Sequence, residues 1–293
     1  MPTHSVTPNV LCIGEVLWDC LPTGKYPGGA PMNVAYHLTK LGCTAWPVSS
    51  VGDDELGNHL LRRLREWGVP CDLVGIDQSR PTGIVNVTLK NGSPSYDIVE
   101  NVAWDHIPFP NEHVRLLEGA DALIFGSLAM RGNRNRLLLG ELMQRAPSAF
   151  TVFDVNLRPP FDDHQVVWEL ARQAHLVKLN DEEIDALLGE RNDTHDLEAR
   201  ARQFADRIGC HQVSVTAGSD GAGLLRDGEW FWASSNPVVV SDTIGAGDSF
   251  LAVLVAGLLQ TPDQPQQILE RACRLAGFVA SRSGATPEHE FDP

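Results

Sequence analysis

Two hydrophobic periods alternate along most of the chain. Short apolar runs of strand character are followed by longer segments in which apolar residues recur every three or four positions, as on one face of a helix. Strands that alternate with helices predict a mainly parallel central sheet covered by helices on both faces. The strand-like runs are 10–14, 45–51, 121–127, 150–155, 175–179 and 212–216, and the helix-like segments are 30–38, 54–67, 134–145, 165–173, 181–188, 197–208, 248–259 and 268–281.

Residues 82–101 interrupt this alternation. Two runs of alternating character, 84–89 and 96–99, flank Asn91-Gly92, a dipeptide typical of tight hairpin turns. We therefore expect a small sheet that projects from the α/β body, in a position suited to a lid. A second hairpin is predicted around Asp227-Gly228.

Length and composition are those of a globular protein. The chain has 293 residues, 43% hydrophobic and 21% charged, which suits one large α/β domain or two small ones. It shows no internal repeat and no linker, and the longest loop-like run, 191–196, is too short to divide domains. We expect a single domain that spans residues 1–293.

Charge and cysteine usage narrow the classes of partner and compartment. A net charge of −15 argues against a polyanionic partner such as nucleic acid. No basic leader segment starts the sequence, and no run reaches the length that a membrane span requires. The cysteines lack metal-ligand spacing, so we expect reduced thiols in a cytoplasmic protein. They are Cys12, Cys20, Cys43, Cys71, Cys210 and Cys273.

A glycine-rich turn at 241–250 carries the clearest chemistry. A strand-like segment, 236–240, precedes it and an apolar helix follows, so the turn delivers the chain into a helix N-terminus. Gly245 and Gly247 permit close backbone approach, and the unpaired N–H groups of the first helical turn attract an anion such as phosphate. Asp248 lies at the mouth of this site, where it is either a proton acceptor or a helix N-cap. The turn is neither a Walker A loop nor a G-x-G-x-x-G motif.

A second glycine motif, Gly-Gly-Ala-Pro-Met-Asn-Val-Ala, covers 28–35. Its glycines let the backbone approach a ligand, and Asn33 offers hydrogen-bond donors and an acceptor. Asp19 follows the first strand, where a carboxylate can bind two neighbouring hydroxyl groups. A tight turn with a helix cap, and a structural Asp, remain the simpler alternatives.

The two glycine motifs together resemble the ribokinase-like (PfkB) family of sugar kinases. The first motif and the sequence Asp-Thr-Ile-Gly-Ala-Gly-Asp at 242–248 match the two signatures of that family in the right order. The resemblance covers residues 10 to 287 and implies a three-layer α/β fold with a β-sheet lid from about 15–27 and 84–101. It also implies roles for several residues: Asp248 as catalytic base, Gly245, Ala246 and Gly247 as the anion hole, and Asp19, Gly28, Gly29 and Asn33 as sugar ligands.

The same resemblance implies a nucleotide side with two kinds of ion. ATP is the expected phosphoryl donor. Glu183 of an Asn-x-x-Glu motif would place Mg²⁺ through water, although a charged first helical turn is the alternative for this acidic cluster. Nucleotide contacts are expected at Asn180, Thr216, Gly218, Gly221 and Cys273, and a monovalent cation, K⁺, at Asp242 and the carbonyl groups of Ile244, Val279, Arg282 and Gly284.

Three further matches resemble the fructokinase branch: Gly-Glu-Val-Leu-Trp-Asp at 14–19, the Gly-Gly-Ala-Pro form of the first motif, and Asp-Val-Asn-Leu-Arg-Pro at 154–159. We therefore expect a fructokinase that makes fructose 6-phosphate. Arg158 either meets the substrate or the transferring phosphoryl group, or forms a salt bridge on a loop.

Other functions remain open. The acceptor is alternatively ribose, tagatose, 2-keto-3-deoxygluconate or a nucleoside such as adenosine. A sugar- or nucleotide-binding sensor without catalysis is the alternative from another class. The missing G-x-G-x-x-G fingerprint argues against a dinucleotide-dependent dehydrogenase. The resemblance also suggests a homodimer that pairs through the lid.

Overall fold

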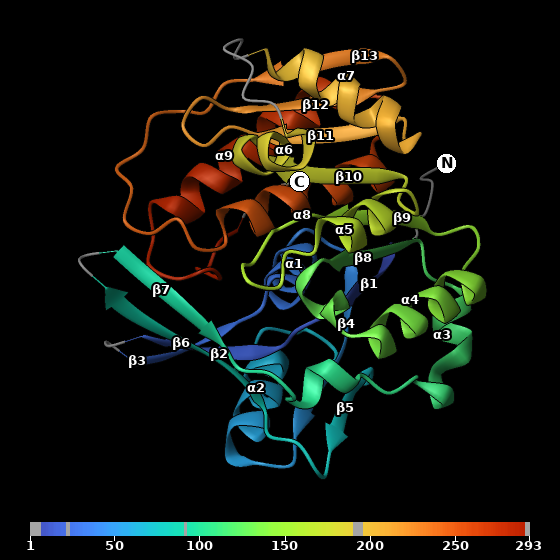
Figure 1. The fold of residues 1–293 in the computed structure, drawn as a ribbon, viewed down its shortest axis with the longest axis vertical. Helices are drawn as coiled ribbons and strands as arrows, with labels where there is room; N and C mark the ends of the chain where they lie inside the picture. The colour runs from blue at the N-terminus through green and yellow to red at the C-terminus, as the bar shows by residue number, and fades with distance from the viewer. Residues whose placement is uncertain (1–6, 22–23, 91–92, 190–195, 291–293) are drawn as a thin grey trace.

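The computed structural model describes residues 7–21, 24–90, 93–189 and 196–290, and nine strands of that part form one central sheet (Figure 1). Neighbouring strands from β5 to β11 are parallel, whereas the pairs β11–β12 and β12–β13 are antiparallel. The mainly parallel sheet predicted from the sequence is confirmed. In spatial order the strands are β13 (Glu229–Ala233), β12 (Ala222–Arg226), β11 (Gln212–Thr216), β10 (Leu176–Asn180), β9 (Phe150–Asp154), β8 (Ala122–Gly126), β1 (Asn9–Ile13), β4 (Thr44–Gly52) and β5 (Val74–Asp77).

Helices cover both faces of this sheet, which gives the three-layer arrangement that the sequence predicts. Side chains alternate along β1, so that Val10 and Cys12 join one hydrophobic cluster and Leu11 and Ile13 join the other. The first cluster is covered by α1 (Ala30–Lys40), α2 (Glu55–Glu66), α8 (Ala246–Gln260) and α9 (Pro265–Ala280). The second is covered by α3 (Val114–Glu118), α4 (Asn133–Arg145), α5 (His164–Ala171), α6 (Asp181–Leu188) and α7 (Leu197–Ile208).

Short 3-10 turns complete the described helices. They are η1 (Ala103–His106), η2 (Asn111–His113) and η3 (Leu128–Arg131). No helix in the described ranges is long and apolar enough to cross a membrane.

The small separate sheet that we expected is present and projects to one side of the body (Figure 1). Two antiparallel hairpins are joined by the parallel pairing of β2 with β6. Its strands are β3 (Gly24–Gly28), β2 (Leu17–Leu21), β6 (Gly83–Lys90) and β7 (Ser93–Ile98), in spatial order. The Asn91-Gly92 turn, most of the 191–196 loop and the first six residues lie outside the described part of the chain.

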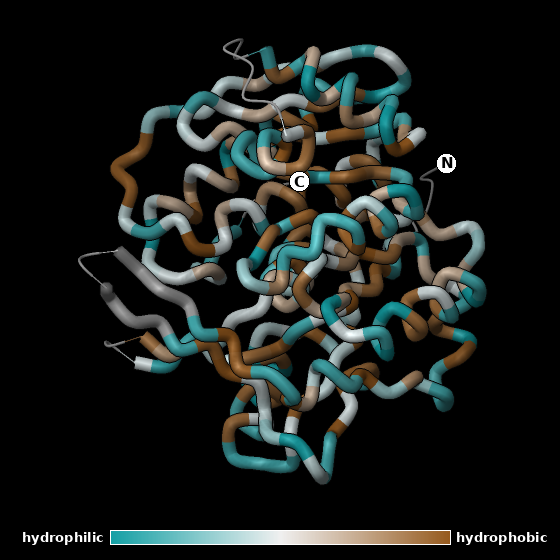
Figure 2. The backbone as a smooth tube through the Cα atoms, viewed as in Figure 1, coloured by the Kyte–Doolittle hydropathy of each residue, from teal (hydrophilic) through white to brown (hydrophobic). Residues whose placement is uncertain are grey.

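One local prediction differs from the structure, and two strands were not found from hydrophobic periodicity. The segment 236–240, predicted as strand-like, is not a strand: it leaves the sheet, and Val238, Val239 and Val240 are 41%, 89% and 59% exposed. Figure 2 shows this apolar stretch on the outer connection between β13 and α8. Conversely, the glycine- and proline-rich β3 is ordered by pairing with β2, and the edge strand β5 carries too few apolar residues to be found by periodicity.

One threonine joins the base of the small sheet to the body. The Thr82 hydroxyl accepts from the Gly52 N–H at 2.9 Å and donates to Asp54 Oδ1 at 2.7 Å, and its own N–H donates to Asp54 Oδ2 at 2.8 Å. Asp54 also caps α2 by accepting from the Gly57 N–H. Because Thr82 immediately precedes β6, this network fixes where the small sheet leaves the body.

Replacing Thr82 with Val should therefore destabilise the protein. Val fills almost the same volume but leaves the buried Gly52 N–H and one Asp54 oxygen without their hydroxyl partner, which costs about 1–3 kcal/mol. Urea denaturation measures the loss, and Thr82→Ser, which keeps the hydroxyl, is the matched control. Equal free energies of unfolding for the two variants would show that the hydroxyl network does not hold this junction.

Candidate active site

Polar residues from the motifs found in the sequence gather beyond the carboxyl ends of the parallel strands. Glu15 lies two residues beyond the end of β1, while Asp154, Asn180 and Thr216 end β9, β10 and β11. Because these strands run in the same direction, their carboxyl ends meet at one edge of the sheet, where ligands of such sheets bind. The N-terminus of α8 carries Asp248, whose carboxyl is electrostatically coupled to Asp154 at this edge.

The glycine turn at the start of α8 leaves no space for side chains. Gly245 has φ 77°, a left-handed conformation, and a Cβ added there would lie 2.5 Å from the Cα of Ala285. Gly245 is the N-cap residue, and among the described residues no side-chain hydrogen bond caps the helix. Asp248 therefore does not act as an N-cap, which removes the simpler of its two interpretations.

The Asp248 carboxylate instead meets Asn33 of α1. Asn33 Nδ2 donates to Asp248 Oδ2 at 2.8 Å, a hydrogen bond that joins the two glycine motifs. Burial raises the pKa of Asp248 to about 6, and the charge of Asp154 adds to this effect, while Asn33, Lys178 and Arg158 oppose it. A carboxyl group with such a pKa is largely ionised at neutral pH and still basic enough to accept a proton.

The second glycine motif packs tightly around Asp19 and Glu15. A Cβ on Gly28 would lie 2.1 Å from Asp19 Oδ2, and one on Gly29, which has φ 110°, would lie 2.3 Å from the Glu15 carbonyl oxygen. Burial raises the pKa of Asp19 to about 6, with the charge of Arg158 opposing and that of Asp248 adding to the shift. The structure thus brings Asp19, Gly28, Gly29 and Asn33 together with Asp248.

Arg158 lies exposed on the loop that follows β9. Its Nη1 donates to the Leu157 carbonyl at 3.0 Å, and no carboxylate of the described residues is within ion-pair distance of its guanidinium. Its charge nevertheless lowers the pKa values of Glu15, Asp19 and Asp248. The salt-bridge interpretation is thus not supported, and Arg158 supplies positive charge to this group of carboxyls.

A buried ion pair behind the glycine turn was not predicted. Lys178 Nζ donates to Asp154 Oδ1 at 2.9 Å, and the two residues are only 6% and 4% exposed. Nζ lies 3.1 Å from the position of a Cβ on Gly247, beside the first turn of α8. Burial lowers the pKa of Lys178, but the charges of Asp154, Glu183 and Asp248 outweigh it and the net pKa is raised. The sequence signal that could have revealed this ion pair is the lysine inside the apolar run of β10.

The Asn-x-x-Glu motif forms a capping box at the start of α6. Asn180 Oδ1 accepts from the Glu183 N–H, and Glu183 Oε2 accepts from the Asn180 N–H, both at 2.8 Å. Glu183 Oε1 also accepts from the Leu157 N–H at 2.8 Å. Glu183 is therefore a structural link between α6 and the loop that carries Arg158, whatever further role it has toward Mg²⁺.

The predicted nucleotide loop is a tight turn after β11. The Ala217 N–H donates to the Gly221 carbonyl, and a Cβ on Gly221 would lie 2.1 Å from the Ala233 carbonyl oxygen. Ser235 donates to the Gly218 carbonyl, which joins this loop to the segment with the exposed valines. Cys273 is 5% exposed and its thiol donates to the Ala233 carbonyl, so it has little surface for a base, and its nucleotide contact stays a prediction.

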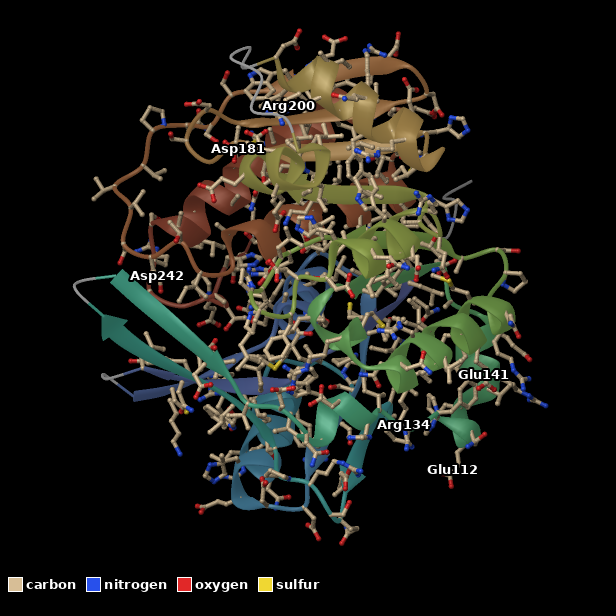
Figure 3. All side chains as sticks on the ribbon, viewed as in Figure 1. Glu112, Arg134, Glu141, Asp181, Arg200 and Asp242 are labelled. Carbon is tan, nitrogen blue, oxygen red and sulfur yellow. The ribbon has the colours of Figure 1, made fainter. Side chains whose placement is uncertain are left out.

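The residues predicted to hold a monovalent cation also lie close together. Asp242, labelled in Figure 3 on the connection into α8, accepts from the N–H groups of Ile244 and Gly284 at 3.0 and 3.2 Å. The Val279 carbonyl accepts from the Arg282 N–H at 2.9 Å. The described residues form no cluster of three or more His, Cys, Asp or Glu side chains suited to a metal.

A family model for pfkB carbohydrate kinases matches residues 9–290. The chain belongs to the pfkB family of carbohydrate kinases. The match covers nearly the whole sequence, so the resemblance based on the two glycine motifs is confirmed.

Individual members of the pfkB family agree with this assignment over nearly their full length. A sugar kinase of Pyrococcus horikoshii is 30% identical over 269 residues, 86% of this chain and 83% of that protein. Its crystal structure in complex with ATP has a TM-score of 0.78 over 94% of both chains, at 27% identity. The fructokinase of Solanum tuberosum is 27% identical over 301 residues, 95% of this chain and 91% of that protein.

A structure at lower sequence identity holds a sugar and a nucleotide. The crystal structure of a fructokinase double mutant from Vibrio cholerae, with fructose, ADP and a potassium ion bound, has a TM-score of 0.82 at 22% identity. It covers 97% of this chain and 96% of that chain. This likeness shows a shared fold.

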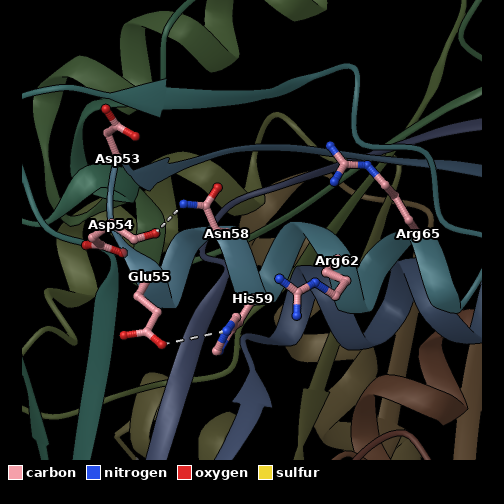
Figure 4. Close-up of a pocket in the computed structure, with 7 residues that line it drawn as sticks. All are labelled: Asp53, Asp54, Glu55, Asn58, His59, Arg62 and Arg65. Carbon is pink, nitrogen blue, oxygen red and sulfur yellow. Dashed lines mark hydrogen bonds and ion pairs between the residues drawn. The ribbon is translucent and has the colours of Figure 1, made fainter.

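A separate polar groove of this pfkB kinase follows α2 (Figure 4). Asp54 is already engaged there as the helix cap, and Glu55 and His59 form a weak exposed pair at 3.9 Å. None of the predicted site residues lines this groove. It is formed by Asp53, Asp54, Glu55, Asn58, His59, Arg62 and Arg65.

Breaking the Lys178–Asp154 pair of this kinase should reduce its stability strongly. Lys178→Met leaves the Asp154 carboxylate buried without its counter-charge, which costs about 3–5 kcal/mol. The free energy of unfolding in urea measures the loss. The double variant Lys178→Met/Asp154→Asn removes both charges and should recover part of it, and a double variant as unstable as the single one would contradict a buried charge pair.

Proposed function

We propose that this carbohydrate kinase transfers the γ-phosphate of ATP to the primary hydroxyl of D-fructose and forms fructose 6-phosphate. The observation that carries the mechanism is Asp248, held by Asn33 at the N-terminus of α8 with a pKa raised to about 6. The wild-type chain should release ADP in a fructose-dependent manner.

Each part of the site has a defined task in this proposal. Asp248 takes the proton of the attacking hydroxyl, while Asp19 and Asn33 hold the sugar together with the backbone of Gly28 and Gly29. The N–H groups at Gly245–Gly247 stabilise the charge of the transferring phosphoryl group. Lys178, next to Gly247, and the exposed Arg158 supply positive charge to the same region.

Mg²⁺ is expected to bind mainly through phosphate oxygens and water, as is usual for this ion. When bound, it would neutralise charge on the nucleotide phosphates. The residues fit such an arrangement, because Asp154 Oδ2 is buried without a partner among the described residues, whereas both Glu183 oxygens already accept backbone hydrogen bonds. Glu183 would then act only through water.

The nucleotide is placed on the side of the Thr216–Gly221 loop in this proposal. This loop, Asn180 and the exposed valines at 238–240 would contact ATP. The bound potassium of the Vibrio cholerae fructokinase supports a K⁺ site at Asp242 and the neighbouring carbonyl groups. The small sheet would act as a lid that excludes water, and its pairing across a homodimer stays a prediction.

Fructose as acceptor rests on the branch motifs and on the likeness to the Solanum tuberosum fructokinase. The test is coupled ADP release with ATP, Mg²⁺ and K⁺ for fructose, ribose, tagatose, 2-keto-3-deoxygluconate and adenosine, beside a blank without sugar. The highest kcat/KM with fructose supports the proposal. A higher value with another acceptor keeps the kinase and replaces the substrate, whereas binding without turnover favours a sensor.

Asp248→Asn should abolish most of the turnover without unfolding the protein. Loss of general-base catalysis lowers kcat by roughly two or more decades. The Asn33 hydrogen bond can still reach an amide oxygen, and removal of a half-buried carboxylate relieves a desolvation cost, so the melting temperature should stay equal or rise. Near-normal kcat, measured with saturating ATP and fructose, would exclude Asp248 as the base.

The pH dependence should show an acid limb. A base must be ionised to accept a proton, so kcat/KM should fall as the pH falls through the range of about 6 to 7 in which Asp248, Asp19 and Glu15 titrate. Arg158 lowers the pKa of all three groups, so Arg158→Met should move the limb to higher pH. An unmoved limb, or one below pH 5, would contradict this electrostatic coupling.

A further inference from the structure

Glu15 is a buried carboxyl group with one oxygen left without a partner. The residue follows β1 and is 4% exposed. The backbone N–H groups of Ala30 and of Glu15 itself lower the pKa of the carboxyl, whereas Oε2 accepts no hydrogen bond from the described residues. Buried polar atoms without partners are rare in native proteins, so Oε2 calls for a donor from outside the chain.

The surroundings of Glu15 are those of the sugar ligands. Arg158 lowers and Asp248 raises its pKa, and the same two charges act on Asp19. A Cβ on Gly29 would lie 3.4 Å from Glu15 Cγ, so the Gly28-Gly29 turn lies directly against this side chain. Asn33, which donates to Asp248, also has a buried acceptor without a partner among the described residues, its side-chain oxygen Oδ1. Two free acceptors thus belong to residues around one catalytic carboxylate.

We propose that Glu15 is a further sugar-binding residue that selects neutral acceptors. Oε2 accepts a hydrogen bond from a hydroxyl of the sugar other than the one that is phosphorylated. The same carboxylate repels an acceptor that places a carboxylate or phosphate there, because like charges in a buried site are costly to bring together. The proposal rests on the sugar-kinase function and extends it from a catalytic reaction to a substrate class, neutral ketoses.

Glu15→Gln tests this directly. The amide keeps one oxygen for the Ala30 N–H and replaces Oε2 with an NH₂ group, which donates where the carboxylate accepted. At pH 8, where the ionised form prevails, kcat/KM for fructose should fall roughly ten- to hundredfold, the value of a hydrogen bond to a charged group. The loss should appear mainly in KM. The ratio of kcat/KM for 2-keto-3-deoxygluconate to that for fructose should rise.

Asp196→Asn is the matched control. It makes the same carboxylate-to-amide change at the N-terminus of α7, where Asp196 Oδ1 accepts from the Ala199 N–H at 3.1 Å, away from the site residues. Both kinetic constants should stay within about twofold, and so should the selectivity ratio. An unchanged KM for fructose in Glu15→Gln, with a lower melting temperature, would reduce Glu15 to a structural residue and overturn the proposal.

Deoxy sugars provide a test that needs no variant. In the wild type, one monodeoxyfructose should lose about as much in kcat/KM as fructose loses in Glu15→Gln, and the two losses should not add. Equal kcat/KM for fructose and for every monodeoxyfructose that keeps the 6-hydroxyl would overturn the proposal even if the variant failed to fold. If the wild type turned over no sugar, the kinase function would fail separately, and calorimetry would decide: weaker fructose binding by Glu15→Gln supports the role, whereas equal or absent binding rejects it.

Discussion

The site depends on the ion pair between Lys178 and Asp154. An ammonium group beside the N-terminus of a helix is unfavourable, because the dipole of α8 is positive at that end. Burial of this charge adds a desolvation cost. Asp154 offsets both effects because it lies in register with Lys178 on the neighbouring parallel strand. Lys178 Nζ lies beside Gly247, where the proposed mechanism places the charge of the transferring phosphoryl group.

Negative charge is concentrated among the residues proposed to bind the sugar. Asp248 raises the pKa values of Glu15 and Asp19, and the exposed Arg158 lowers the pKa of all three groups. Burial, followed by the charge of Asp154, raises the pKa of Asp248 and gives it the basicity that the proposed proton acceptor needs near neutral pH. In the proposed mechanism, Lys178 gives the phosphate side positive charge and the three carboxyls give the sugar side negative charge, while the Asn33–Asp248 hydrogen bond joins the two glycine motifs.

The sequence predicted the parts of the structure that local chemistry decides. Gly245 and Gly29 were found because their backbone conformations and close contacts exclude other residues, and the layers were found because period and burial agree along each strand. The prediction of a strand at 236–240 was wrong. The apolar pattern of this segment resembles a strand, yet the chain leaves the sheet there. In the opposite direction, β3 is a strand only through its pairing with β2.

Lys178 and Glu15 could not be found in the same way, because their importance arises from register and packing between distant segments. Lys178 meets Asp154 only when β10 pairs with β9. Glu15 is enclosed only when the Gly28-Gly29 turn folds back on it. The Asn33–Asp248 bond spans 215 residues of sequence, so it forms only once α1 and α8 have packed on the same face of the sheet. The arrangement of the proposed catalytic residues therefore depends on the completed sheet, whereas the glycine turn proposed to bind an anion can be predicted from a few consecutive residues.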